Sequence, residues 1–229
     1  MPALSEFLLM YGPLWADRFD REHAGPFNDQ TRGVCALYER LLGRYRNDPC
    51  HKMIVCCVDQ ITDERRTTIM GICHVEAVVA LSSFFDLTDR EKQRFALEAL
   101  MQGIRRVVAL QGWGPEPFQR AYDQALALDY VNRYMWRRPA ASPDRRYTAE
   151  LWLDHGVHSC DFTVILNERR GRHEVLRQLV TQQPPDELIF ANHLGRLEWL
   201  SPSAVALFDK DGAAGWTVGV PPDLREETT

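Results

Sequence analysis

The amino-acid sequence predicts an α+β fold with largely antiparallel sheet, a central antiparallel helix pair and a β-rich C-terminal half. Three observations support this fold class. Strand-like segments are joined mainly by tight turns, two helical segments follow one another in the middle of the chain, and the pattern after residue 139 changes from helical to alternating. The regular alternation of strand and helix that is typical of doubly wound nucleotide-binding folds is not apparent.

The first third of the chain predicts one helix and one hairpin. Val34, Leu37, Leu41 and Tyr45 recur at intervals of three and four, which is typical of an amphipathic helix from about residue 28 to residue 46. Segments 51–58 and 67–81 are rich in Ile, Val and Cys and flank the polar turn 62–65. We expect these two segments to pair as an antiparallel hairpin that is buried on at least one face.

The helix pair follows from capping signals. Thr88 and Glu91 have the spacing of a capping box, and Gly112 supplies the left-handed residue that ends the helix. Gly114-Pro115 starts a second helix, because proline is tolerated at the first helical position, and Pro139 bounds its end. The short connection predicts that the two helices lie antiparallel.

Residues 139–144 have the composition of a linker and mark the expected boundary. The expected organisation is a helical and hairpin half at 1–138, a β-rich half at 139–220, or one continuous domain, and a flexible tail at 221–229. The β-rich half is expected to hold strands at 147–153 and 158–166, a short helix from about residue 172 to Pro184, and short strands at 188–191, 196–200, 204–208 and 216–218.

Composition narrows the class of protein. The 229 residues carry 27 Lys and Arg against 32 Asp and Glu, and the net charge of −5 disfavours nucleic acid as a partner of the whole surface. No segment is apolar over the length that crosses a bilayer, and the N-terminus lacks the features of a secretory signal. Most of the six cysteines stand inside apolar runs, which favours reduced thiols and a cytoplasmic location.

Cys50, His51, Cys73 and His74 contain enough ligands for a zinc site. In the expected hairpin, however, the imidazoles and the thiols emerge on opposite faces of the sheet. One metal ion cannot then bind all four side chains, so we expect no metal and no cofactor here.

Asp154, His155 and His158 belong to the densest group of chemically able side chains, the turn 154–161. They are candidates for a general acid, a general base or metal ligands in an enzyme with a dispersed site. The turn lacks the spacing of a known catalytic motif. The alternative interpretation is a polar hairpin tip.

A basic cluster lies between residues 133 and 146, and its binding candidates are Tyr134, Trp136, Arg137 and Arg138. Arg, Tyr and Trp suit either nucleic acid or an acidic protein partner. The alternative is that the arginines complement the dipole at a helix C-terminus while the aromatic rings pack against the neighbouring sheet. The arginine-rich loop 167–173, expected between a strand and a helix, could hold a phosphate or be a solvated turn.

No nucleotide-binding loop, nucleophile elbow or metal-binding motif occurs in the sequence. We therefore expect a non-enzymatic, cytoplasmic protein-binding protein. In size, charge and fold class the chain is similar to bacterial immunity proteins, and that similarity implies a toxin as the partner, with the acidic surface attracting a basic one. The alternatives are the enzyme with a dispersed site and a nucleic-acid-associated regulator.

Overall fold

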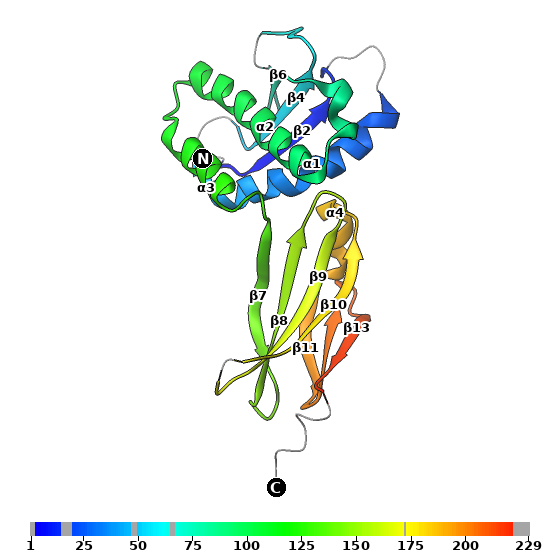
Figure 1. Ribbon diagram of the computed structural model, residues 1–229. Coiled ribbons are helices and arrows are strands. Elements are labelled where there is room, and N and C mark those ends of the chain that lie inside the picture. Colours follow the sequence, from blue (N-terminus) through cyan, green and yellow to red (C-terminus); the bar gives the residue numbers. More distant parts are fainter. Residues whose placement is uncertain (1–2, 15–19, 47–49, 65–66, 172, 222–229) are drawn as a thin grey trace. The chain divides into compact units, whose positions relative to one another are not determined.

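The computed structural model describes residues 3–14, 20–46, 50–64, 67–171 and 173–221. The chain forms two compact units, Met1–Asn132 (unit 1) and Arg133–Thr229 (unit 2), each with its own hydrophobic core (Figure 1). Helices, antiparallel sheets and a β-rich C-terminal half confirm the predicted α+β class. We expected the boundary at residue 139, whereas the units divide after Asn132. The tail expected at 221–229 lies outside the described residues apart from Pro221.

Unit 1 contains a four-stranded sheet in the order β2-β4-β6-β5, formed by β2 (Glu6–Tyr11), β4 (Lys52–Val58), β5 (Thr67–Ile69) and β6 (Ile72–Val78). Strands β2, β4 and β6 are parallel, and only β5 is antiparallel to its neighbour β6. Two short strands, β1 (Ala3–Leu4) and β3 (Tyr45–Arg46), pair separately.

The predicted antiparallel hairpin of 51–58 and 67–81 is therefore wrong. The chain reverses inside the second apolar segment, at Met70 and Gly71, where φ is 50° and 77°. These left-handed residues join β5 to β6, and β6 then runs parallel to β4. The polar turn at 62–65 is more conspicuous in the sequence than the turn at Met70-Gly71. The strand that follows it, however, is the short β5, which pairs with β6 and not with β4.

Three helices belong to unit 1: α1 (Arg21–Leu42), α2 (Asp89–Gln111) and α3 (Glu116–Ala127), with a 3-10 helix η1 (Leu81–Asp86) before α2. The capping box of Thr88 and Glu91 and the left-handed end at Gly112 are confirmed. Helix α1 begins earlier than predicted, because Asp20 caps it by accepting from the His23 amide. Helix α3 ends at Ala127 rather than near Pro139, and Asp129 and Tyr130 follow with positive φ.

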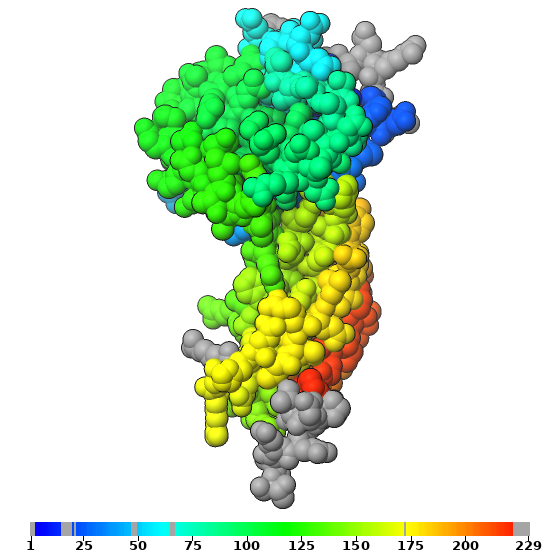
Figure 2. Space-filling view, viewed as in Figure 1, coloured from blue at the N-terminus to red at the C-terminus, as the bar shows by residue number. Residues whose placement is uncertain are grey.

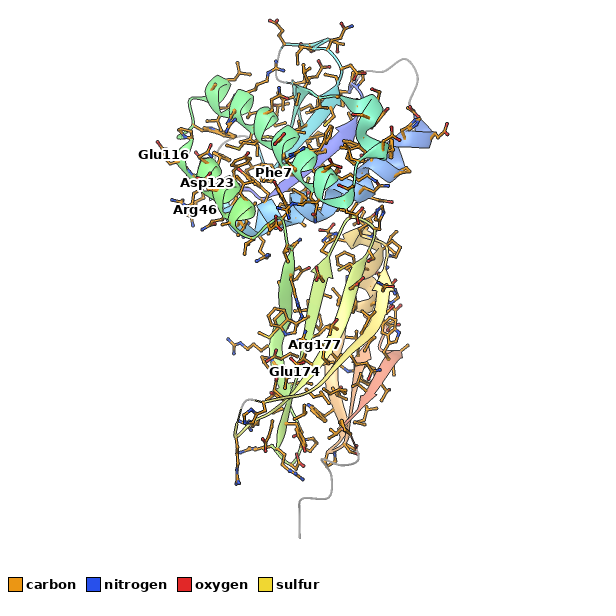
Figure 3. The ribbon with its side chains drawn as sticks, viewed as in Figure 1. Phe7, Arg46, Glu116, Asp123, Glu174 and Arg177 are labelled. Atoms are coloured by element: carbon orange, nitrogen blue, oxygen red, sulfur yellow. The ribbon has the colours of Figure 1, made fainter. Side chains whose placement is uncertain are left out.

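The helices gather on one face of the parallel sheet (Figure 1). Phe7 of β2, labelled in Figure 3, points into unit 1. Its ring lies edge-on to that of Tyr38 of α1, with ring centroids 5.2 Å apart. Gly103 of α2 lies against Val55 of β4, and the Tyr38 hydroxyl donates to the Phe118 carbonyl of α3 at 3.0 Å. The odd-numbered residues of β2 and β4 thus face the core.

Unit 2 contains two antiparallel sheets that share one core. The larger has the order β10-β9-β8-β7, from β7 (Arg133–Ala141), β8 (Tyr147–His155), β9 (Cys160–Glu168) and β10 (Glu174–Gln183). The smaller consists of β11 (Arg196–Ser201), β12 (Ala204–Phe208) and β13 (Ala214–Gly219). The strands predicted at 147–153, 158–166, 196–200, 204–208 and 216–218 are confirmed.

Two predictions in unit 2 are wrong. The helix expected from about residue 172 is strand β10, and the strand expected at 188–191 falls in the helical turns α4 (Glu187–Phe190) and η2 (Ala191–His193). In β10 the register with β9 shifts twice, between Glu174 and Leu176 and between Leu179 and Thr181. These irregularities give a strand the spacing of three and four that is typical of a helix. No helix among the described residues has the length and apolarity needed to span a membrane.

Candidate interaction surface

The three candidate residues of turn 154–161 have different environments. His155 is buried, its Nε2 lies 2.6 Å from the Pro185 carbonyl oxygen, and its ring meets Phe190 edge-on. Asp154 is exposed in a cross-strand row with Arg133 and Asp161, and His158 is exposed in the turn. Alternation along β8 therefore directs Asp154 and His155 to opposite faces of the sheet. His155 packs against Phe190 of α4 and the Pro185 carbonyl.

The pKa of Asp154 depends on burial and on the charges in that cross-strand row. Desolvation raises the pKa of Asp154, the facing Asp161 raises it further, and Arg133 acts in the opposite direction. Asp161 itself accepts hydrogen bonds from Ser159 Oγ and Gln182 Nε2. The geometry is that of a polar cross-strand ladder on the outside of a sheet.

The cysteines and histidines considered for zinc are separated by strand alternation. Cys50 and Cys73 are buried and hydrogen-bonded to each other through their thiols, and this contact together with burial raises the pKa of Cys50. His74, next to Cys73 in β6, points to the opposite face of the sheet. Among the described residues, no group of three or more His, Cys, Asp or Glu side chains is arranged to hold a metal ion.

The candidate binding residues of the basic cluster lie on β7 and not on a helix end as one interpretation expected. Tyr134 and Trp136 pack against the core of unit 2. Arg137 has a φ of 61° where the β7–β8 register shifts, its guanidinium lies 4.4 Å from the Trp136 ring centroid, and it donates to the Gly195 carbonyl. Arg138 is exposed. Three of these four side chains thus contact neighbouring parts of unit 2.

The second face of the parallel sheet in unit 1 is not predicted by the sequence. Leu8, Ile54 and His74 form one row across β2, β4 and β6, and Glu6, Lys52 and Ile72 form the next. The apolar members of these rows are half-buried and belong to neither hydrophobic core. We call the following residues the open face: Leu8, Met10, Ile54, Ile69, Ile72 and His74.

One end of this face is closed by a loop. The carboxylate of Glu76 is buried and accepts hydrogen bonds from the Thr62 amide at 2.6 Å, the Thr62 hydroxyl at 2.5 Å and the Asp63 amide at 2.9 Å. These bonds fasten the segment before β5 over Glu76, where Cys56 is also buried. The accessible part of the face is therefore formed by the rows of Leu8 and of Ile72.

The outer edge of β2 is protected. Its Phe7 amide donates to Glu39 at 2.7 Å, and Arg32 donates to the Phe7 carbonyl at 3.1 Å while it pairs with Glu39 at 2.8 Å. These side chains of α1 occupy the backbone groups with which another strand would pair. The exposed apolar surface of this sheet is thus its face and not this edge.

Met70 lies in the turn that follows Ile69 of the open face. Its side chain is 91% exposed, and its backbone has the left-handed φ of 50° that favours Asn or Gly. It follows Ile69, which is itself 41% exposed. A large apolar side chain in this turn is unfavourable for the free chain both in conformation and in solvation.

His74 gives the open face a second unusual feature. Its Nδ1 is buried and has no hydrogen-bond partner among the described residues. Burial lowers the pKa of His74, and the positive charge of Lys52 acts in the same direction. The lowered pKa favours the neutral imidazole, which adds to the apolar character of the face.

Sequence reasoning had one signal for this surface. Residues 52–58 read Lys-Met-Ile-Val-Cys-Cys-Val, a nearly continuous apolar run that a strand buried on both faces would have. Only the pairing with β2 and β6, and the location of the helices, show that the described helices lie on just one of those faces. No family model, curated protein or solved structure matches this chain.

Proposed function

We propose that this protein acts by binding another protein through the open face. The observation that carries the proposal is a parallel sheet whose described helices cover one face only. Parallel sheets are normally covered on both faces, because their strands are apolar on both sides. A contiguous apolar surface of this kind on an otherwise charged chain is typical of an interaction site.

The open face favours a particular kind of partner. Leu8, Ile54 and Ile72 present a sheet surface of the type that an amphipathic helix covers in α/β proteins. Glu6 and Lys52, whose charged atoms lie 3.5 Å apart, supply a polar border. An apolar centre with a polar rim is the usual anatomy of a protein interface. The proposed occupant is therefore an amphipathic helix of a partner protein.

The narrower expectation, that the partner is a toxin which this protein neutralises, stays a proposal. It is supported by the size and the net charge of −5, and by no particular residue of the open face. The identity of the bound protein decides directly whether the partner is a toxin.

The test begins with tagged protein purified from its native host after mild crosslinking, with the bound protein identified by mass spectrometry. Affinity is then measured by calorimetry with the purified partner for wild type, Ile54→Glu and Leu110→Glu. Leu110, on α2, is 57% exposed and lies away from the open face, so it is the matched control. Circular dichroism establishes that each variant is folded.

We expect Ile54→Glu to weaken binding by at least about tenfold, because a charge would be buried against the partner, and Leu110→Glu to leave affinity unchanged. Equal effects of the two variants would place the interface elsewhere. A chain that self-associates through this face instead of recruiting another protein would also contradict the proposal.

A further inference from the structure

Two arginine-rich turns that are distant in the sequence lie side by side at one end of unit 2. The turn between β7 and β8 contains Arg145 and Arg146, and the turn between β9 and β10 contains Arg169 and Arg170. The amide of Arg169 donates to the carbonyl of Arg146 at 2.8 Å, which joins the two turns directly. We call these four residues the arginine tip.

The arginine tip is exposed and locally positive. Arg145, Arg169 and Arg170 are exposed, and no ion pair joins them to a carboxylate among the described residues. The segment around residue 170, yellow in Figure 2, stands out from the surface. Residues 142–146 and 167–171 hold four arginines and two acids, so their net charge is 4 − 2 = +2, against −5 − 2 = −7 for the remaining chain.

The carboxylates near the arginine tip either accept hydrogen bonds from other groups or are half-buried. Asp144 accepts from the Ser142 hydroxyl at 2.6 Å and the Arg146 amide at 3.1 Å, which shapes the turn. Glu174, at the start of β10, forms an ion pair with Arg177 at 2.6 Å (Figure 3). Glu168, half-buried, is the remaining acid of the two turns. The guanidinium groups of Arg145, Arg169 and Arg170 are thus available to an external anion.

We propose that the arginine tip binds the phosphate backbone of nucleic acid. Arginine presents a planar fork of donors that matches a phosphate group, and the three exposed guanidinium groups of Arg145, Arg169 and Arg170 on adjacent turns can contact successive phosphates. A two-stranded β-ribbon also has the width to enter the major groove of a duplex. This surface and the open face belong to different units, so the two proposals are independent.

Other polyanions fit the described tip less well. Among its described residues the tip has no exposed large hydrophobic side chain, whereas a protein partner is usually held by buried aromatic or aliphatic anchors. The same absence disfavours a membrane surface, where apolar residues insert beside the basic ones. Charge without apolar contact is typical of backbone recognition in nucleic acids.

The test is fluorescence anisotropy with a labelled 20-base-pair duplex in 50 mM and 200 mM NaCl. The variant is Arg145→Glu, Arg169→Glu and Arg170→Glu together, and the control is Arg94→Glu, Arg105→Glu and Arg120→Glu, three exposed arginines of unit 1. Each triple variant changes the charge by −6, from −5 to −11, so the two are matched in net charge. A second tip variant with Gln at the same three positions removes the positive charges without adding negative ones, so it keeps the test valid if the Glu variant misfolds.

Wild type and control are expected to bind in 50 mM NaCl and to lose about 40-fold in affinity by 200 mM, as three phosphate contacts imply. Both tip variants are expected to lose at least about tenfold in 50 mM NaCl, with a shallower salt dependence. Equal losses in tip and control variants would overturn the proposal, as would tighter binding to polyglutamate or to anionic vesicles than to the duplex. Absence of duplex binding in 50 mM NaCl would overturn it as well.

Discussion

Met70 and His74 depart from what each position favours; His74 belongs to the open face, and Met70 lies in the turn beside it. Met70 has a left-handed backbone and an almost fully exposed side chain, while His74 has a buried ring nitrogen without a partner among the described residues. Departures of this kind cluster where function restrains sequence. Sequence reasoning could not find them, because neither a φ angle nor an unsatisfied nitrogen is visible before the strand pairing is known.

His74 gives the first prediction at this scale. Its pKa is lowered in the folded protein by burial first and by Lys52 second, while Asp63 and Glu76 also border its pocket. The lowered pKa means that the unfolded chain takes up a proton more readily. The resulting stability is complete above the unfolded pKa of about 6.5 and is lost as pH falls through the folded pKa.

We therefore expect His74→Gln to flatten the decrease in stability between pH 7.5 and pH 5.5, measured by urea unfolding at both pH values. His158→Gln, at an exposed position, serves as the control and should retain the decrease seen in wild type. If His74→Gln lost as much stability as wild type over this range, the burial argument would be wrong.

At the scale of elements, the sequence predicted those whose signals are local. The capping box at Thr88 and the left-handed Gly112 specify the ends of α2 through bonds within a few residues. The pairing of β4 with β6 depends instead on β2, which is more than forty residues away in the chain. The β10 prediction failed because bulges give a strand helical spacing, and only the contact with β9 distinguishes the two.

The contact between α2 and β4 gives a second prediction. A Cβ added at Gly103 would lie 2.7 Å from Val55 Cγ1 and closer still to Val55 Cγ2. Gly103→Ala gains about 1 kcal/mol in helix propensity. We nevertheless expect a net loss of about 1 kcal/mol in the free energy of unfolding, because overpacking a core costs about 1–3 kcal/mol.

The double variant Val55→Ala with Gly103→Ala removes the clash and should show a favourable coupling energy in a double-mutant cycle of urea unfolding. A Gly103→Ala variant that is more stable than wild type would show that α2 does not approach the sheet so closely. This contact is what assigns α2 to the covered face and leaves the other face open.

For the whole molecule, the α+β class was predictable, whereas the surface proposed for function was not. The candidate residues Tyr134, Trp136 and His155 are largely used in packing unit 2. In the sequence, the arginines at 145–146 belong to the basic cluster 133–146 and those at 169–170 to the loop 167–173, and only the sheet order brings them together. Chemistry that depends on non-local pairing leaves no compact motif in the sequence.

The central claim is that the open face is kept for binding at a cost in stability. A two-residue hairpin turn with positive φ at both positions favours Asn-Gly, but this chain has Met70-Gly71. Met70→Asn should therefore stabilise the free protein by about 0.5–1 kcal/mol, because Asn adopts left-handed backbone more readily and exposes less apolar surface.

The most direct test measures two quantities for the Met70→Asn variant: its free energy of unfolding, and its affinity for the partner protein that was recovered from the native host. The account predicts a higher midpoint of urea unfolding with affinity for the partner reduced by about fivefold or more, since the substitution removes an apolar contact of roughly 1 kcal/mol. A stabilised variant that binds the partner as tightly as wild type would contradict it, because the exposed Met70 beside the open face would then contribute nothing to the surface that the partner covers.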